Sequence, residues 1–248
     1  MLLILPGKRI HLQIFGLCII ILTVCAFCFA VHPLLTEWQG KGWVISYVNT
    51  SHKVIALTFD DGPDPEATPM LLDILDKNKA NATFFVLGVQ GEKHPALVKK
   101  IVNNGHELAS HGYSHKFKNY GNKDFFIDDI QKNNVLLFSL TGVKPLLFRP
   151  PGGYLSSDLV DYANKNGIKI ITWTWQADYK DWKARNSDKL AQSIIKNASP
   201  GQIVLLHDGG QNREVMIRAL TKSLPELARQ GYRFVTVSEL LALKTAEQ

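Results

Sequence analysis

From Val54 to the C-terminus, short apolar runs alternate with longer amphipathic stretches, and this order restricts the folds open to the chain. The first run, Val54–Phe59, is almost continuously apolar, and Glu66–Asn78 follows it with leucines on one helical face. Apolar strands that are each followed by a helix are typical of a parallel sheet covered by helices. Seven or eight such units predict an α/β fold, namely a distorted (β/α) barrel.

The same pattern gives bounds for the remaining elements. Further strands are expected over residues 82–87, 106–109, 146–148, 168–172, 202–206 and 233–237. Helices are expected over residues 95–103, 123–140, 156–166, 188–197 and 214–230, and Ser238 is expected to cap a last helix. Because barrels of this kind place their chemistry at the carboxyl ends of the strands, polar clusters that follow strands are the candidate sites.

The N-terminal segment is set apart by its hydrophobicity. Ile14–Val31 is a run of 18 residues without a charge, long enough for a membrane helix, and Lys8 and Arg9 precede it. The positive-inside rule then predicts a cytoplasmic N-terminus and an exported domain. The competing interpretation is a cleaved signal peptide, for which Cys28-Phe29-Ala30 is a poor cleavage site, and which would make the protein secreted.

Domain boundaries follow from this segment. We expect residues 1–31 to hold the cytoplasmic N-terminus and membrane anchor, residues 32–51 a tether, and residues 52–248 the catalytic domain. All three cysteines lie in the apolar segment, so the exported domain uses no disulfide and no thiolate ligand. The net charge of +6 is scattered, and no nucleic-acid-binding motif is present, so nucleic acid is not an expected partner.

Two clusters follow early strands and carry metal-binding chemistry. Asp60 and Asp61 end the first strand, where adjacent carboxylates are costly to bury unless a cation compensates them. A solvated Asp-Gly-Pro turn is the alternative interpretation. His111 and His115 follow the third strand, and two imidazoles four residues apart with one carboxylate make a typical transition-metal site.

Three later clusters are ambiguous when taken singly. Arg149 ends a strand and could hold a carboxylate bidentately, although the prolines and glycines after it fit a structural turn equally well. An aromatic and acidic cluster follows, with core packing or sugar binding as its interpretations: Trp173, Trp175, Asp178, Asp181 and Trp182. His207 lies just past a buried strand.

Together these clusters resemble the polysaccharide deacetylases of carbohydrate esterase family 4, which carry the NodB homology domain. The resemblance covers about Val54–Leu243 and includes all five family motifs in order. It implies a distorted (β/α) barrel and a hydrolase that acts on linear amides. It also implies one divalent metal ion, usually zinc, with Co²⁺, Ni²⁺ and Mn²⁺ as alternatives.

The resemblance assigns roles residue by residue. Asp60 becomes the general base, and the metal ligands are Asp61, His111 and His115. The supporting assignments are Arg149 tethering the base, His207 as general acid and Asp178 tuning that acid. The expected substrate contacts are Gly152, Tyr154, Trp182 and Leu205.

Two positions depart from the family pattern. Gly112 stands where the family often has Ser or Thr, a change expected to soften the metal-binding loop. Gly152 stands where the family often has Tyr, although a glycine still offers the backbone N–H that contacts the oxyanion. We therefore expect an altered fit for substrate and an intact set of ligands.

The expected reaction removes N-acetyl groups from a cell-surface polysaccharide and releases acetate. An anchored domain without a carbohydrate-binding module favours N-acetylglucosamine of the cell's own peptidoglycan. The alternatives are a chitin-oligosaccharide deacetylase, an O-acetyl esterase of the xylan type and a non-catalytic glycan-binding domain. The expected partners are the polysaccharide and, through the N-terminal helix, the membrane, and we expect a monomer.

Overall fold

A computed structural model describes residues 34–244 of the chain. The apolar segment Ile14–Val31, where the membrane helix is expected, lies outside the described residues. Between residues 34 and 244, no helix combines the length and hydrophobicity needed to cross a bilayer. The sheet and the helices that cover it belong to one compact unit that begins at Trp43.

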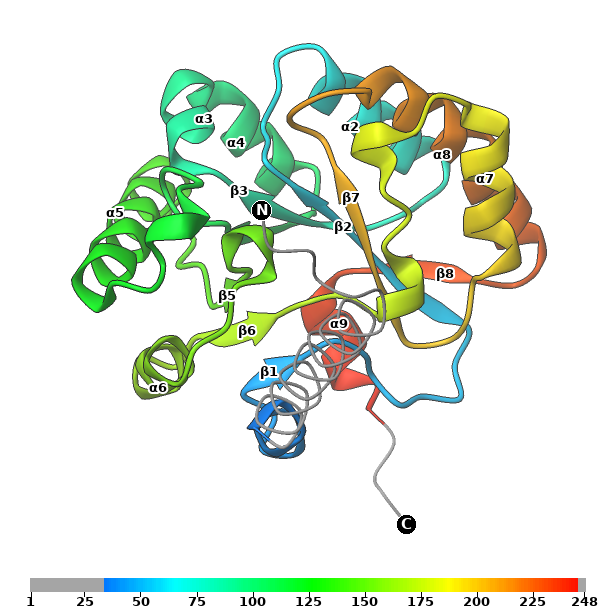
Figure 1. Ribbon diagram of the computed structural model, residues 1–248. Helices are drawn as coiled ribbons and strands as arrows, with labels where there is room; N and C mark the ends of the chain where they lie inside the picture. The colour runs from blue at the N-terminus through cyan, green and yellow to red at the C-terminus, as the bar shows by residue number, and fades with distance from the viewer. Residues whose placement is uncertain (1–33, 245–248) are drawn as a thin grey trace, which may run out of the picture. The chain divides into compact units, whose positions relative to one another are not determined.

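All strand ladders of this unit run parallel in one eight-stranded sheet (Figure 1). The strands are β1 (Val44–Ile45), β2 (Val54–Asp60), β3 (Thr83–Val86), β4 (Glu107–Ser110), β5 (Leu147–Phe148), β6 (Lys169–Ile171), β7 (Gln202–His207) and β8 (Arg233–Val235). The spatial order is β1-β6-β5-β4-β3-β2-β7, and β8 pairs with the first half of β2. The predicted parallel α/β sheet is thus confirmed.

The sheet curls into a half-barrel rather than closing by a complete ladder. Its two end strands are β1 and β7. Among the described residues, isolated bridges join β7 to the segments that follow β1 and β6, with Tyr47 paired to Gln202 and Asp178 to Leu205. We call this junction, formed by residues 46–48 and 174–178 beside β7, the seam. β1 itself lies within the segment expected to be a tether, so the sheet begins before residue 52.

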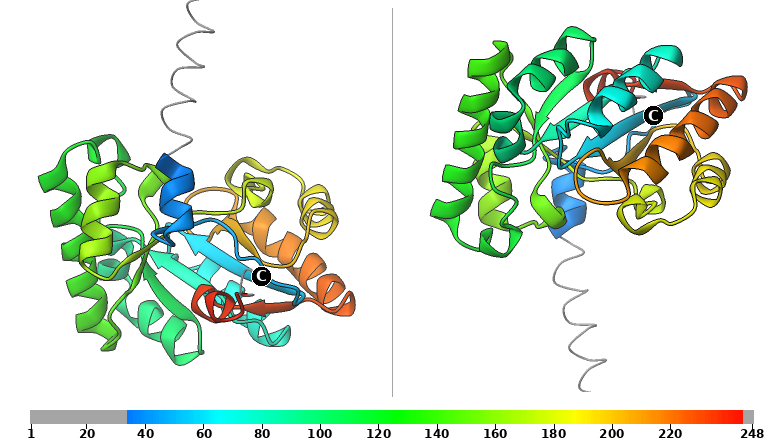
Figure 2. Two further views of the ribbon diagram at one scale, coloured as in Figure 1. Left: turned by 90° about the horizontal axis from the view of Figure 1, so that it is seen from below. Right: turned by 90° about the horizontal axis from the view of Figure 1, so that it is seen from above.

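Helices surround the curled sheet, most of them on its outer face and the last, Val237–Ala242, against the core inside the curl. They are α2 (Ala67–Lys77), α3 (Gly88–Lys93), α4 (Pro95–Asn103), α5 (Lys123–Thr141), α6 (Ser157–Lys165), α7 (Ser187–Lys196), α8 (Arg213–Arg229) and α9 (Val237–Ala242). Figure 2 shows the strands between a group that contains α5 and a group that contains α8. Most expected helix bounds agree with these within two residues, and α3 was not expected.

Helix ends follow local capping chemistry. The side chains of Asn122, Ser156 and Asn186 cap α5, α6 and α7, and α5 ends at Gly142 in the left-handed conformation. The prediction that Ser238 caps the last helix is wrong. Thr236 caps α9 through a reciprocal capping box, because the chain leaves β8 two residues earlier than expected.

The two faces of each strand bury different residues. On β2, Ile55, Leu57 and Phe59 pack in the core under the helices, whereas Val54 and Ala56 belong to a second core inside the curl. This alternation follows from the two-residue period of a strand. A side chain at the end of a strand therefore faces the interior of the curl or the helices according to its parity.

Candidate metal centre and active site

Because side chains alternate between the two faces of a strand, three polar side chains at or just after strand ends face the inside of the curl. Asp60 continues the inner row of β2, and His207 continues that of β7, where Ile203 is an inner residue. Asp60 and His207 are register partners across the β2–β7 ladder. Arg149 follows Leu147 of the inner row by two residues. The carboxyl ends of neighbouring strands thus bring an acid, a base and a guanidinium together.

Asp61, His111 and His115 form a group whose ligand atoms lie within 4.8 Å of one another. Asp61 has a left-handed backbone (φ 71°), which breaks the strand alternation and turns its carboxylate toward the two imidazoles. Its Oδ1 is 3.4 Å from His111 Nε2 and 3.3 Å from His115 Nε2. That Oδ1 is buried and accepts no hydrogen bond, so a cation there would satisfy it.

The hydrogen bonds of His111 suit it to metal binding. Its Nδ1 lies 2.8 Å from the backbone oxygen of Arg149, which can only accept, so Nδ1 carries the proton and Nε2 is left with a lone pair facing Asp61. Two imidazoles and one carboxylate are a donor set that zinc and related ions accept. The residues present therefore fit a divalent metal ion.

Electrostatics favour an ionised carboxylate in this group. Burial works to raise the pKa of Asp61, but the adjoining imidazole of His111 and the charges of His111, His115 and His207 lower it to about 2. Burial works to lower the pKa of His111, and the carboxylates of Asp60 and Asp61 outweigh it and raise that pKa. Proton and metal ion would compete for the same nitrogen.

Asp60 is held in place by a fully buried arginine. Arg149 Nη1 donates to Asp60 Oδ1 and to Thr58 Oγ1, both at 2.7 Å. Its remaining nitrogens donate to the backbone oxygens of Ile171 and Thr172, and its guanidinium lies over the ring of Phe85. This ion pair agrees with the expectation that Arg149 holds the general base. Arg149 contacts only Oδ1 of Asp60, so Oδ2 is outside the ion pair.

The carboxylate that contacts His207 is Asp181, which corrects the sequence-based assignment of Asp178. His207 Nδ1 lies 2.8 Å from Asp181 Oδ1, and the backbone N–H of His207 donates to Asp181 Oδ2 at 2.9 Å. Asp178 instead accepts from the backbone N–H of Lys180. The left-handed conformation of Lys180 (φ 50°) turns the chain so that the second carboxylate, not the first, points to β7.

This pair sets the protonation state of His207. Burial works to lower the pKa of His207, but the hydrogen bond and charge of Asp181, with smaller contributions from Asp60 and Asp61, raise it to about 9. The imidazole is therefore a cation at neutral pH and has a proton to donate.

The expected substrate contacts lie near the carboxyl end of β7 or on turns that follow β5 and β6. Leu205 is buried on β7 with the parity of His207. Gly152 lies in the turn η2 (Pro151–Gly153) after β5, and Tyr154 follows it, partly exposed. Trp182 in the turn η4 (Asp181–Lys183) is half exposed, and its backbone oxygen accepts from Asn212. Their contacts with substrate stay predictions.

Asp129 fixes the metal-binding loop, a role that the sequence analysis missed. This buried carboxylate on α5 accepts from the backbone N–H groups of Tyr113 and Ser114 at 2.8 and 3.1 Å. It also accepts from the hydroxyls of Ser114 and Tyr120 at 2.6 and 2.8 Å. A signal was available in the sequence, because Asp129 falls beside Ile130 on the apolar face of the expected helix.

The same contact explains Gly112. Its backbone is left-handed (φ 76°), and a Cβ there would lie 2.4 Å from Tyr120 Oη and 2.5 Å from Asp129 Oδ2. The expected softening of the loop is therefore not what the structure shows. Four hydrogen bonds to one carboxylate hold the loop, and glycine is what lets that carboxylate approach.

A second carboxylate to which the sequence analysis gave no role is Asp208, which is buried directly after β7. Burial raises its pKa to about 7, against the hydrogen bond that it accepts from Thr68 at 2.6 Å. A Cβ on Gly62 would lie 2.2 Å from Asp208 Oδ2, and one on Gly209 would lie 2.3 Å from the backbone oxygen of Asp61. These glycines allow the loops after β2 and β7 to pack directly against each other.

Comparisons with known proteins agree with this geometry. A family model described as polysaccharide deacetylase matches residues 47–171. A peptidoglycan-N-acetylglucosamine deacetylase of Bacillus cereus is 43% identical over 211 residues, which cover 85% of this chain and 99% of that protein.

Solved structures share the fold as well. The crystal structure of the Bc1960 peptidoglycan N-acetylglucosamine deacetylase superposes with a TM-score of 0.79 and 34% identity, covering 86% of this chain and 98% of that one. BA3943 of Bacillus anthracis, described as a CE4 family pseudoenzyme, superposes with a TM-score of 0.75 and 29% identity, covering 83% of this chain and 71% of that one.

Proposed function

The chain belongs to the polysaccharide deacetylase family, and on this premise we propose that it hydrolyses the N-acetyl groups of N-acetylglucosamine in peptidoglycan. The observation that carries the proposal is the group of Asp61, His111 and His115 beside two prepared proton-transfer residues. Fold alone does not carry it, because a relative of the same fold is described as a pseudoenzyme.

The proposed metal ligands are Asp61, His111 and His115, and we take zinc as the ion. When bound there, a divalent cation supplies Lewis-acid activation of water and of the acyl oxygen. The protein's contribution is to fix the loop that carries the two histidines, through its contacts with Asp129, and the ring of His111, through the Arg149 backbone oxygen.

Asp60 and His207 divide the proton transfers. Asp60, aligned by Arg149, accepts a proton from the attacking water as the C–O bond forms. His207, held as a cation by Asp181, donates a proton to the amide nitrogen as the C–N bond breaks. A backbone N–H of the Gly152 turn donates to the oxyanion. The products are acetate and a free amino sugar.

Acetate release tests the reaction directly. We expect release from purified peptidoglycan, a weaker signal from chitin oligomers and none from acetylxylan, with loss on chelation and recovery on adding Zn²⁺. Release from acetylxylan alone would mean an O-acetyl esterase. No release from any substrate by metal-loaded protein, with binding retained, would mean a glycan-binding domain and would overturn the proposal.

We also propose that the catalytic domain acts outside the cytoplasmic membrane, as a monomer anchored by residues 1–31. The uncharged Ile14–Val31 run after Lys8 and Arg9 supports this orientation. Protease added to intact cells should digest the domain, and membranes should retain the full-length chain after a salt wash. Full-length protein in the soluble fraction would contradict the anchor.

A further inference from the structure

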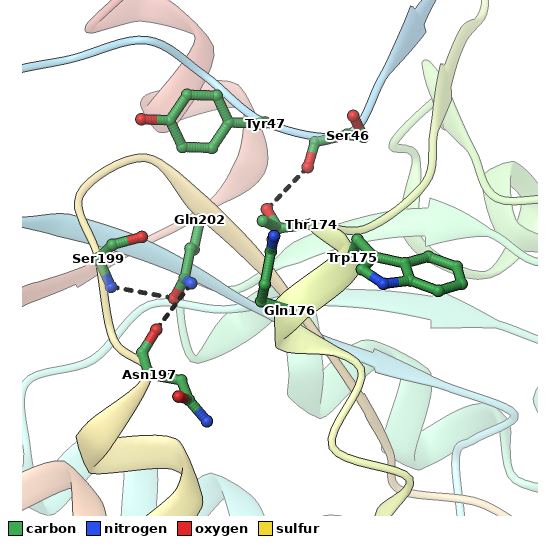
Figure 3. A pocket seen from close by; sticks show the side chains of 8 residues that line it. All are labelled: Ser46, Tyr47, Thr174, Trp175, Gln176, Asn197, Ser199 and Gln202. Atoms are coloured by element: carbon green, nitrogen blue, oxygen red, sulfur yellow. Dashed lines mark hydrogen bonds between the residues drawn. The ribbon is translucent and has the colours of Figure 1, made fainter. Parts of the chain in front are cut away.

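The seam carries a hollow that is separate from the metal centre. Its volume is about 530 Å³, and its walls come from the segments that follow β1, β6 and α7 and from the start of β7 (Figure 3). The lining residues are Ser46, Tyr47, Thr174, Trp175, Gln176, Asn197, Ser199 and Gln202. None of them belongs to the proposed catalytic or metal-binding group.

Two exposed aromatic rings border this hollow. Trp175 is 85% exposed and Tyr47 is 46% exposed, although tryptophan is highly buried on average. In Figure 3 the ring of Tyr47 lies on one side of Thr174 and the ring of Trp175 on the other. Such rings offer a flat apolar face with a polar handle, which suits a ligand that has both C–H faces and hydroxyls.

The polar residues that line the hollow are already held by hydrogen bonds. The side-chain amide of Gln202 donates to the backbone oxygen of Asn197 at 2.8 Å and accepts from the backbone N–H of Ser199 at 3.1 Å. Thr174 Oγ1 donates to the backbone oxygen of Ser46 at 2.8 Å. A hollow whose polar lining is already hydrogen-bonded loses little conformational freedom when a ligand binds.

A second hollow of about 430 Å³ shares Trp175, Gln176 and Asn197 with the first. It continues along Asp178, Tyr179 and Lys180. The next residue in the chain is Asp181, which contacts His207. The two hollows thus follow the segment that leads from the seam to the catalytic acid.

We infer that these hollows form a second glycan-binding site, the seam groove, which holds a stretch of N-acetylhexosamine polymer away from the reacting acetyl group. The first hollow is lined by hydroxyls, carboxamides and two aromatic rings and by no carboxylate, ammonium or guanidinium, so its chemistry matches an uncharged sugar. Gln176 and Asn197 are exposed carboxamides that can pair with the acetamido group. The choice of polymer rests on the proposed function.

Trp175→Ala tests the groove because an exposed side chain can be removed without opening a cavity. Phe138→Ala is the matched control, since Phe138 is 54% exposed on α5 and lines neither hollow. Binding of glycol chitin, a soluble N-acetylglucosamine polymer, is measured by calorimetry with zinc-loaded full-length protein carrying Asp60→Asn to prevent turnover. The dissociation constant should rise roughly tenfold with Trp175→Ala and stay unchanged with Phe138→Ala.

A kinetic readout separates the groove from the catalytic centre. In the otherwise wild-type protein, Trp175→Ala should lower the ratio of kcat/KM for glycol chitin to that for the N-acetylglucosamine trimer about fivefold. Equal losses on both substrates, or polymer binding that matches the Phe138→Ala control, would overturn the groove. Failure of the proposed function looks different: the wild type would release no acetate, while its binding of polymer still depended on Trp175.

Discussion

Replacing Asp181 by Asn should shift the alkaline limit of activity. In the wild type Asp181 raises the pKa of His207 to about 9, and without its charge burial lowers that pKa toward the ordinary 6.5. At pH 7.5 a group of pKa 9 is about 97% protonated and one of pKa 6.5 about 9%, so the acid form falls roughly tenfold. Because only protonated His207 donates to the leaving nitrogen, kcat/KM should fall by the same factor and recover as the pH is lowered.

The assay is the pH profile of acetate release between pH 5 and 10, with the His207 imidazole titrated by NMR. Asp178→Asn is the control, because Asp178 accepts only from the Lys180 backbone and its loss should leave the alkaline limb in place. An alkaline limb that moves with Asp178→Asn and not with Asp181→Asn would refute the reasoning. A loss of activity that is uniform across pH would refute it too.

The same pair predicts a pH-dependent stability. Protonated His207 stabilises the fold because its pKa is higher in the folded state. This contribution to the free energy of unfolding is complete below about pH 6.5 and is lost as the pH rises through about 9. Both side chains are largely buried, so the contribution is on the order of 3 kcal/mol. Denaturant unfolding should therefore separate wild type from Asp181→Asn more at pH 6 than at pH 10, and an equal gap at both would contradict the linkage.

Four further substitutions test the site. Asp60→Asn should abolish acetate release and leave zinc affinity near normal by calorimetry, and near-normal turnover would remove Asp60 as the base. Asp129→Asn places an NH₂ group where a carboxylate oxygen accepts hydrogen bonds from Tyr113 and Tyr120. It should weaken zinc binding about tenfold in chelator competition, and an unchanged affinity would be the contrary result. Arg149→Met leaves the buried carboxylate of Asp60 without its partner and should lower the free energy of unfolding in urea by about 3–5 kcal/mol. A decrease under about 1 kcal/mol would argue against the ion pair. Gly112→Ala forces a Cβ against Asp129 and should lower zinc affinity and Tm together, whereas a neutral result would show that the loop can shift.

Much of this site follows from local rules that act within short stretches of sequence. Continuous apolar runs alternating with amphipathic stretches specify a parallel sheet, and parallel strands end at one edge. Residues placed just after such runs are then expected at the same edge, as Asp60, Asp61, His111 and His207 are, whereas their individual roles came from the family resemblance. The two-residue period of the strands even determines which side of the sheet Asp60 and His207 face.

Other features were decided only by the tertiary structure, because they depend on backbone paths that no local pattern encodes. Asp178 and Asp181 are both acidic and lie three residues apart, and one left-handed residue, Lys180, determines that Asp181 meets His207. Asp129 reaches the metal-binding loop from another helix, across a gap that Gly112 keeps open. By itself, the sequence determined which residue types stand at the ends of the strands. The packing of distant loops against one another decided which of them touch, since those contacts form only when the whole sheet has curled.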